Sequence, residues 1–293
     1  MLRIRLLLFY NIAAWVFLLS LISLSLGCGR FQKDVTVDLP PYVNQLVIEC
    51  YLEAGQQPTV LLTESSGYFD SPALPLVNNA TVTLLNTTTG RGEVLRQSNA
   101  INFSTRKGYN FIGSRFIAPN TGQTYQIEAT DDKGRRVVGT TTFLPPPQFT
   151  SIEARFNDQN KAFLFIRFPD NDPNASNYYR MVINRDSLTG FRESDFTFDA
   201  RFTTNNEVTI GTNYRYEVGD TVIVSLYHIE KSFYDFLRSV QDAARANGNP
   251  FAQPTTIRST VQGGFGVVAA LAYDRRMFII KEDELVYLPL PIR

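Results

Sequence analysis

The chain has 293 residues, which is enough for one large domain or two modest ones. Its 22 Phe and 14 Tyr, against 3 Met and 1 Trp, favour β-strands, because aromatic rings suit a pleated, half-buried surface. The formal net charge is zero and Lys/Arg-rich runs are absent from the sequence, so the electrostatic footprint of a nucleic-acid-binding protein is missing.

The first 27 residues are typical of an export signal. Arg3 and Arg5 precede an apolar stretch, Leu6–Leu26, and small residues then lead to Cys28. A short basic region, an apolar core and a small-residue site make up a secretory signal. We therefore expect a signal peptide at residues 1–27.

The position of Cys28 resembles a bacterial lipoprotein signal, in which the thiol is acylated and becomes the mature N-terminus. Ser25 departs from that pattern, which usually has leucine there. We expect lipidation at Cys28 and a polar tether over residues 28–40. An uncleaved anchor and a plain cleaved signal stay open, since about 20 apolar residues suffice to span a bilayer.

The other cysteine, Cys50, is predicted to be a buried small hydrophobe. Leu46, Ile48, Cys50 and Leu52 share one face by the two-residue period of a strand. A reactive thiolate would need a basic neighbour, and the adjacent sequence offers none.

Alternating apolar residues predict strands throughout the first half. The predicted strands cover residues 45–53, 59–64, 80–86, 125–130 and 135–143. Asp131–Gly134 joins the last two as a hairpin connection. This pattern predicts an N-terminal β-sandwich at residues 41–144, either immunoglobulin-like or transthyretin-like.

A long connection between the second and third predicted strands is the most suggestive surface. Residues 65–79 include Tyr68, Phe69, Leu74 and Leu76. Long loops are often functional, and exposed apolar side chains would form a contact patch for a partner or ligand. The alternative is that these residues fold back on the edge of the sandwich.

Three consecutive prolines, residues 145–147, predict a stiff linker and a domain boundary. A proline-rich loop inside one domain is the alternative. Strands resume beyond the prolines, and we expect a C-terminal β-sandwich at residues 148–293. The predicted strands are residues 162–168, 178–184, 195–202 and 221–228, with further apolar segments at 267–273 and 277–280.

One amphipathic helix is predicted at about residues 232–247, inserted in the second sandwich. Phe233, Phe236, Leu237 and Val240 recur at helical spacing, and we expect this stripe to pack on the sandwich. Ser232 followed by Asp235 predicts the N-cap, and Asn247-Gly248 predicts the end.

Motifs that carry chemistry are weak in this sequence. His228, the one histidine, is predicted to be a structural, hydrogen-bonded side chain, and a His/Cys metal cluster has too few ligands. Gly264-x-Gly266-x-x-Ala269 fits a dinucleotide fingerprint in form only, because the following residues predict a strand instead of a helix. Close backbone approach is the better interpretation of these glycines.

Asp170-x-Asp172-x-Asn174 starts like a calcium loop but lacks the glycine and glutamate that complete one. An Asx turn beside Pro173 is the favoured interpretation, and whether these residues bind a cation is left open. We expect neither a cofactor nor a resident metal.

The chain also resembles an uncharacterised family of Bacteroidota outer-membrane lipoproteins with a domain of unknown function. The resembling segments extend over nearly the whole mature chain, in the same order: Val37–Pro40, Leu46–Glu49, Tyr68–Asp70, Asn79–Val82, Asn249–Phe251 and Val261–Gly266. That family is commonly encoded beside TonB-dependent receptors. The resemblance therefore implies an outer-membrane, lipid-anchored protein near a receptor barrel, on either face of the membrane, and it supplies no catalytic residues.

Taken together, these features predict a membrane-tethered, non-enzymatic binding or accessory lipoprotein. It would assist a TonB-dependent receptor in ligand capture or assembly. A structural or adhesive envelope protein is the second hypothesis. A carboxylate-dependent hydrolase is the third, since sequence does not give the separation of paired carboxylates.

Overall fold

The computed structural model describes residues 15–17, 20, 42–67, 73–102, 107–170, 175–200, 207–247, 249, 251–253, 255–282 and 284–290. Residues 43–293 form one compact unit, and the strands described here all belong to it. In the described ranges, no helix has both the length and the apolar character of a membrane span.

The first half of the chain folds into antiparallel strands around one apolar core. Every second residue of β1 is buried, including Cys50, as the sequence predicts. The buried positions of the strands in this half form the first core. The strands are β1 (Leu46–Glu53), β2 (Thr59–Glu64), β3 (Ala80–Asn86), β4 (Arg91–Asn102), β5 (Lys107–Ile112), β6 (Thr124–Asp131) and β7 (Arg136–Thr142).

The second half forms strands around a second core, which a three-stranded sheet helps to enclose. That sheet has the order β12-β9-β8, so β9 is central, as its apolar sequence predicts. The elements are β8 (Ser151–Phe156), β9 (Ala162–Pro169), β10 (Tyr178–Arg185), β11 (Arg192–Asp199), β12 (Glu207–Gly211), β13 (Thr221–Ile229), α2 (Lys231–Ala246), β14 (Val261–Gln262), β15 (Phe265–Ile280) and β16 (Leu285–Leu288).

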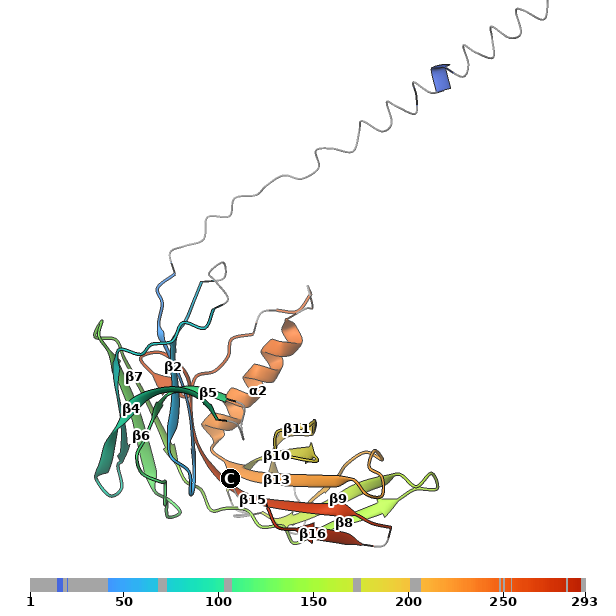
Figure 1. Cartoon of the computed structure of the whole chain (residues 1–293). Coiled ribbons are helices and arrows are strands. Elements are labelled where there is room, and N and C mark those ends of the chain that lie inside the picture. The colour runs from blue at the N-terminus through green and yellow to red at the C-terminus, as the bar shows by residue number, and fades with distance from the viewer. Residues whose placement is uncertain are drawn as a thin grey trace, which may run out of the picture. The chain divides into compact units, whose positions relative to one another are not determined.

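Strand β15 connects the strands of both halves, as Figure 1 shows for the long red strand. Its first part pairs in parallel with β1, with Ile48 opposite Gly266. Its second part pairs antiparallel with β13, with Ser225 opposite Arg275. One sheet of 13 strands results, and β15 provides the pairing between its two parts.

Two expectations about this region are corrected. The apolar segments 267–273 and 277–280 are parts of one strand, β15, which continues through the polar residues that separate them. Within that strand, Arg276 donates to Asp274 at 3.0 Å. The strand predicted at 195–202 is β11, which begins three residues earlier, and Phe196 and Phe198 pack against the second core as half-buried side chains.

The glycines of residues 263–266 allow the parallel pairing of β15 with β1. A Cβ atom on Gly264 would lie 2.4 Å from the Leu46 carbonyl oxygen, and one on Gly266 only 1.9 Å from that of Ile48. Gly263 and Gly266 also have positive φ angles of 79° and 126°. Close backbone approach, the interpretation favoured from sequence, is confirmed.

Helix α2 lies against β15, β13 and β10 through a small third core that includes Phe233 and Ile229. Its bounds are within one residue of those predicted. The predicted cap is wrong, because the N-cap is Glu230 and makes no side-chain capping bond. Asp235 instead accepts a hydrogen bond from Lys231, 2.6 Å away.

The fold is mostly β with a helix in the second half, so the predicted fold class is confirmed. The division into domains at residues 145–147 stays a prediction. Two segments that it assigns to the second domain pair with first-half strands, since β14 pairs with β7 and the start of β15 with β1.

Candidate ligand-binding cleft

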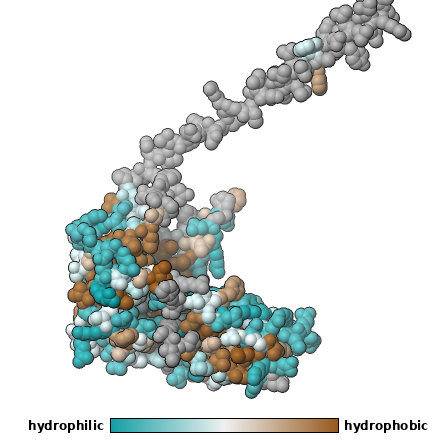
Figure 2. Space-filling view, in the orientation of Figure 1, coloured by the Kyte–Doolittle hydropathy of each residue, from teal (hydrophilic) through white to brown (hydrophobic). Residues whose placement is uncertain are grey.

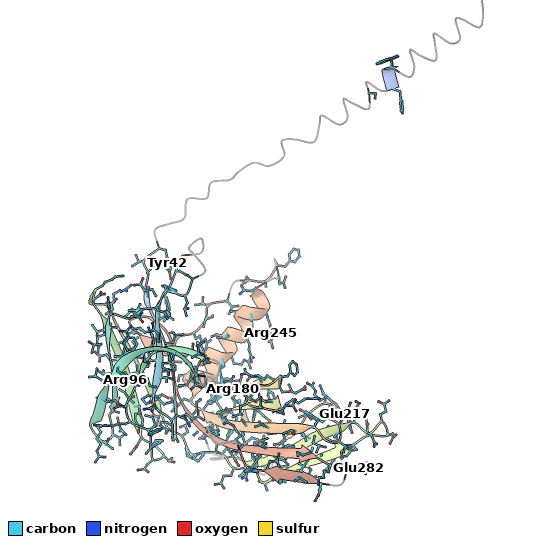
Figure 3. The ribbon with its side chains drawn as sticks, in the orientation of Figure 1. Tyr42, Arg96, Arg180, Glu217, Arg245 and Glu282 are labelled. Carbon is cyan, nitrogen blue, oxygen red and sulfur yellow. The ribbon has the colours of Figure 1, made fainter. Side chains whose placement is uncertain are left out.

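A cleft of about 740 Å³ opens on the face of the sheet opposite to the first two cores. Side chains of β1, β2, β5, β10, β13 and β15 line it, together with α2. Arg180, labelled in Figure 3, lies on β10 where the lower end of α2 approaches the strands. Figure 2 shows brown and teal atoms interspersed over the visible face.

The β1 wall of the cleft carries Glu49, Tyr51 and Glu53, the alternate residues that face away from the first core. Lys107 on β5 forms an ion pair with Glu49, and its Nζ lies 4.2 Å above the centre of the Tyr51 ring. Burial, with the negative charge of Glu49, raises the pKa of Tyr51 above its ordinary value, so this phenol stays protonated at neutral pH.

The floor of the cleft holds a buried arginine, Arg275 on β15, only 8% exposed. Its Nε donates to Ser225 Oγ at 2.8 Å, and an Nη donates to Tyr227 Oη at 2.8 Å. The guanidinium carbon lies 4.4 Å from the centre of the Tyr273 ring. These partners are neutral, so they orient the guanidinium without neutralising its charge.

A second arginine, Arg180 on β10, stands directly opposite Tyr227 in the strand register. Arg180 is paired: it donates two hydrogen bonds of 2.7 Å to the carboxylate of Asp195 on β11. Arg192 donates a third to Asp195, also at 2.7 Å. These two arginines hold the pKa of Asp195 below its ordinary value despite burial, so the group stays ionised.

Helix α2 supplies the apolar wall. Phe236, Leu237 and Val240 line the cleft, and only Phe233 and Ser239 of the helix are fully buried. The predicted apolar stripe therefore packs on the sheet at its N-terminal end and faces the cleft farther along. An apolar wall opposite a few oriented polar groups is the usual composition of a ligand site.

Acid–base chemistry has little support in this geometry. Among the described residues, two acidic ones line the cleft, Glu49 and Glu53, and they are four residues apart on one strand, so their Cα atoms are about 13 Å apart. Each is engaged, Glu49 by Lys107 and Glu53 by the Tyr273 hydroxyl. Cys50 faces the opposite side, where burial raises the pKa of its thiol to about 12.

The contact residues predicted from sequence lie elsewhere. Cys28, Tyr68 and Phe69 are outside the described residues. Leu74 and Leu76 are 62% and 40% exposed and do not line the cleft. The end of their loop does fold back on β2, since the Val77 amide donates to the Leu62 carbonyl at 3.0 Å. A contact role for the four residues stays a prediction.

His228 is buried in a polar network, as predicted for a structural histidine. Its Nδ1 donates to the Pro145 carbonyl at 2.9 Å, and its Nε2 lies 3.2 Å from Asn177 Oδ1. Asn177 and Tyr179 each donate to Asp170 at 2.8 Å. Asp170 is thus a buried acceptor, while Asp172 and Asn174 lie outside the described residues. No cluster of three metal-ligating side chains occurs in the described part of the chain.

Sequence reasoning missed Arg180, Tyr227 and Arg275, because they belong to three strands that meet only in the folded sheet. A local signal did exist. Leu271, Tyr273 and Arg275 alternate on one face of β15, and an arginine that continues an apolar strand face is a candidate for a buried charge.

The family model described as "Domain of unknown function (DUF4249)" matches residues 32–276. No curated protein is significantly similar to the chain. Among solved structures, the crystal structure of the chicken CNTN1 FN1-FN3 domains is 10% identical, with a TM-score of 0.26. The similarity covers 62% of this chain and 57% of that one, so the chain spans little more than half of the chicken structure.

Proposed function

The chain belongs to the DUF4249 family, a domain of unknown function, and from that premise we propose that it is a membrane-tethered, non-enzymatic module that binds a ligand in its cleft. The observation that carries this proposal is the cleft itself. Its volume of about 740 Å³ is in the range of small-molecule sites, and it combines an apolar helix wall with oriented polar groups.

The cleft supports binding over a purely structural or adhesive role. An adhesive protein needs a broad contact surface, whereas the oriented groups here gather in one concave site. The hydrolase alternative needs two carboxylates about 5–10 Å apart across a substrate. Glu49 and Glu53 are on one strand, and each already has a partner.

Tethering at Cys28 gives this binding site its physical advantage. A module held at a membrane has a high effective concentration for any partner in the same membrane. We propose that the partner is a TonB-dependent receptor barrel in the outer membrane, to which the module delivers a ligand or which it helps to assemble. The resemblance described above supports this partner.

The tether is tested by Cys28→Ser. We expect the wild-type protein in the membrane fraction, with the mass of acyl chains on its N-terminal peptide. The variant keeps the apolar stretch Leu6–Leu26 but has no thiol to acylate, so its N-terminal peptide should carry no acyl mass. A wild-type protein that is unmodified at Cys28 and freely soluble would rule out the tether.

The cleft is tested by Val240→Trp, which adds an indole to the apolar wall at a position that is already 36% exposed. Ala244→Trp is the matched control, one turn farther along the same helix and outside the cleft. Each protein is extracted from its native membranes in mild detergent and analysed by native mass spectrometry. We expect the wild type and Ala244→Trp to retain a bound ligand or barrel that Val240→Trp loses.

Equal retention by Val240→Trp would show that the cleft is not the binding site. Recovery of the wild type alone in several detergents would contradict the binding proposal as a whole.

A further inference from the structure

Arg275 differs from the other arginines that are withdrawn from solvent. Among the described residues, each half-buried arginine has a carboxylate partner, whereas Arg275, the most buried, has none within ion-pairing distance. The paired arginines are Arg135, Arg167, Arg180, Arg185 and Arg215.

A buried charge without a counter-charge is costly, and proteins normally pair it. Side chains of the sheet also hold this guanidinium in one orientation. Ser225 and Tyr227 fix its direction through two hydrogen bonds of 2.8 Å, and the Tyr273 ring lies 4.4 Å below it. Two of its five N–H groups are used in this way, and the residue lines the cleft.

The surroundings of Arg275 also favour a negative ligand group. In the part of the chain that the structure describes, four basic residues and two acidic ones line the cleft. Lys107 pairs with Glu49, and Arg180 and Arg192 share Asp195. With Glu53 also counted, four basic residues face three carboxylates among the described residues, so the cleft keeps one net positive charge, and Arg275 is the basic residue there that has no carboxylate within ion-pairing distance. The hydroxyl of Tyr227, which accepts from Arg275, still carries a proton that it can donate.

We propose that Arg275 and Tyr227 form an oxyanion subsite on the floor of the cleft, which binds a carboxylate or phosphate group of the ligand. The guanidinium supplies parallel N–H donors that match either oxyanion, and the Tyr227 hydroxyl supplies another. The ligand's apolar or ring-shaped body then lies along Phe236 and Leu237 of α2. This subsite deepens the proposed function, because it rests on the cleft being the binding site.

The test measures thermal unfolding of the detergent-purified full chain in sodium acetate, sodium benzoate or sodium phosphate, each against sodium chloride at equal ionic strength. At about ten times the dissociation constant, a specific anion raises the melting temperature by about 3 °C. A response to phosphate alone identifies a phosphoryl group, and a response to acetate and benzoate identifies a carboxylate. A larger shift with benzoate than with acetate identifies the ring-shaped body.

The variant Arg275→Met keeps most of the side-chain volume and removes the charge. We expect it to lose the anion-specific shift, and to melt at or above the wild-type temperature in chloride, since an unpaired buried charge is gone. Arg276→Met is the matched control, because Arg276 is exposed, points to the other face and is paired with Asp274. It keeps the shift.

Tyr227→Phe provides a second variant that retains Arg275 and the ring, should Arg275→Met fold poorly. It is expected to weaken anion binding about tenfold, the effect of losing one hydrogen bond to a charged group. An equal shift in wild type and Arg275→Met, or no specific shift in the wild type, overturns the subsite. If that happens while Val240→Trp still loses its bound species, the cleft function stands and only the oxyanion subsite fails.

Discussion

At the scale of single residues, Asn110 substitutes for backbone pairing where β5 departs from β2. Backbone pairing between these strands covers only Thr59 and Val60. Beyond it, the fully buried Asn110 side chain accepts from the Leu62 amide at 2.7 Å and donates to the Leu62 and Val77 carbonyls at 2.9 Å each. The same amide therefore closes the sheet and fixes the end of the 65–79 loop.

Asn110→Ala removes the Asn110 partner of the buried Leu62 amide and Val77 carbonyl, whereas the Leu62 carbonyl still accepts from the Val77 amide. We expect the free energy of unfolding to fall by about 2–3 kcal/mol, as measured by urea denaturation. Asn213→Ala, at an exposed loop position, is the control and stays within about 0.5 kcal/mol of wild type. A loss below 1 kcal/mol for Asn110→Ala would mean that water satisfies these groups.

His228 makes stability depend on pH with a definite sign. Burial lowers its pKa below the ordinary value of 6.5, because the imidazolium is poorly solvated there, although the Pro145 carbonyl and Asp170 oppose the shift. The unfolded chain therefore binds a proton first as the pH falls. The stabilising effect of the neutral ring is complete above about pH 6.5 and is lost as the pH falls through the lower, folded-state pKa.

His228→Gln keeps a hydrogen-bonding side chain and removes this titration. Urea denaturation between pH 8 and pH 5 should show a steeper loss of stability for the wild type than for the variant. His228 is the one histidine in the sequence, so no other histidine titration contributes to the difference between the two proteins. Parallel curves for the two proteins would contradict the assignment.

At the scale of elements, the parallel contact of β1 with β15 depends on Gly266. A methyl group there would lie 1.9 Å from the Ile48 carbonyl oxygen, and the φ angle of 126° is one that other residues avoid. Gly266→Ala should lower the unfolding free energy by about 3 kcal/mol or more, measured by denaturation, because both backbone strain and a clash are introduced.

Gly211→Ala at the end of β12 is the matched control, since a Cβ atom there meets nothing within 4 Å. Its effect should be less than about 1 kcal/mol in either direction. If both alanines are tolerated equally, the glycine turn is not what holds β15 against β1.

The sequence predicts a strand reliably where apolar and polar residues alternate regularly. The bounds of β2 and β3 agree with the sequence pattern in full, because one face of each is apolar and the other polar. Strand β4 was missed, since Arg91–Asn102 is polar along most of its length and has one fully buried residue, Leu95. Such a strand forms because its neighbours β3 and β5 offer hydrogen-bonding partners.

Pairing between distant strands could not be predicted. Ile48 and Gly266 are opposite one another although more than two hundred residues separate them, and no local pattern encodes that register. The cleft depends on this pairing, because Glu49 and Tyr51 from β1 meet Arg275 and Tyr227 only when β15 lies between β1 and β13. The sequence therefore predicted many of the strands but not the site.

At the scale of the whole molecule, β15 makes the two predicted sandwiches depend on each other. Val268 and Ala270 are buried in the first core, while Phe278 and Ile280, on the same strand, are buried in the second. Removing β15 would expose a long edge on β1 and leave two voids in the first core. Long-range pairing of this kind also forms late and slowly.

We therefore expect a fragment of residues 43–147 to lack independent stability, despite containing the whole predicted N-terminal sandwich. Circular dichroism and urea denaturation of the fragment should show no cooperative transition, whereas residues 43–293 unfold in one transition. The control fragment carries residues 43–147 joined through a flexible linker to residues 259–273, which restores β14 and the first part of β15. Because that segment supplies Val268, Ala270 and the partner of β1, cooperative unfolding should return.

If residues 43–147 alone unfold cooperatively, the first sandwich is an autonomous domain and β15 is an addition to it. The boundary at the three prolines would then separate independent folding units, and the cleft would form only when they dock.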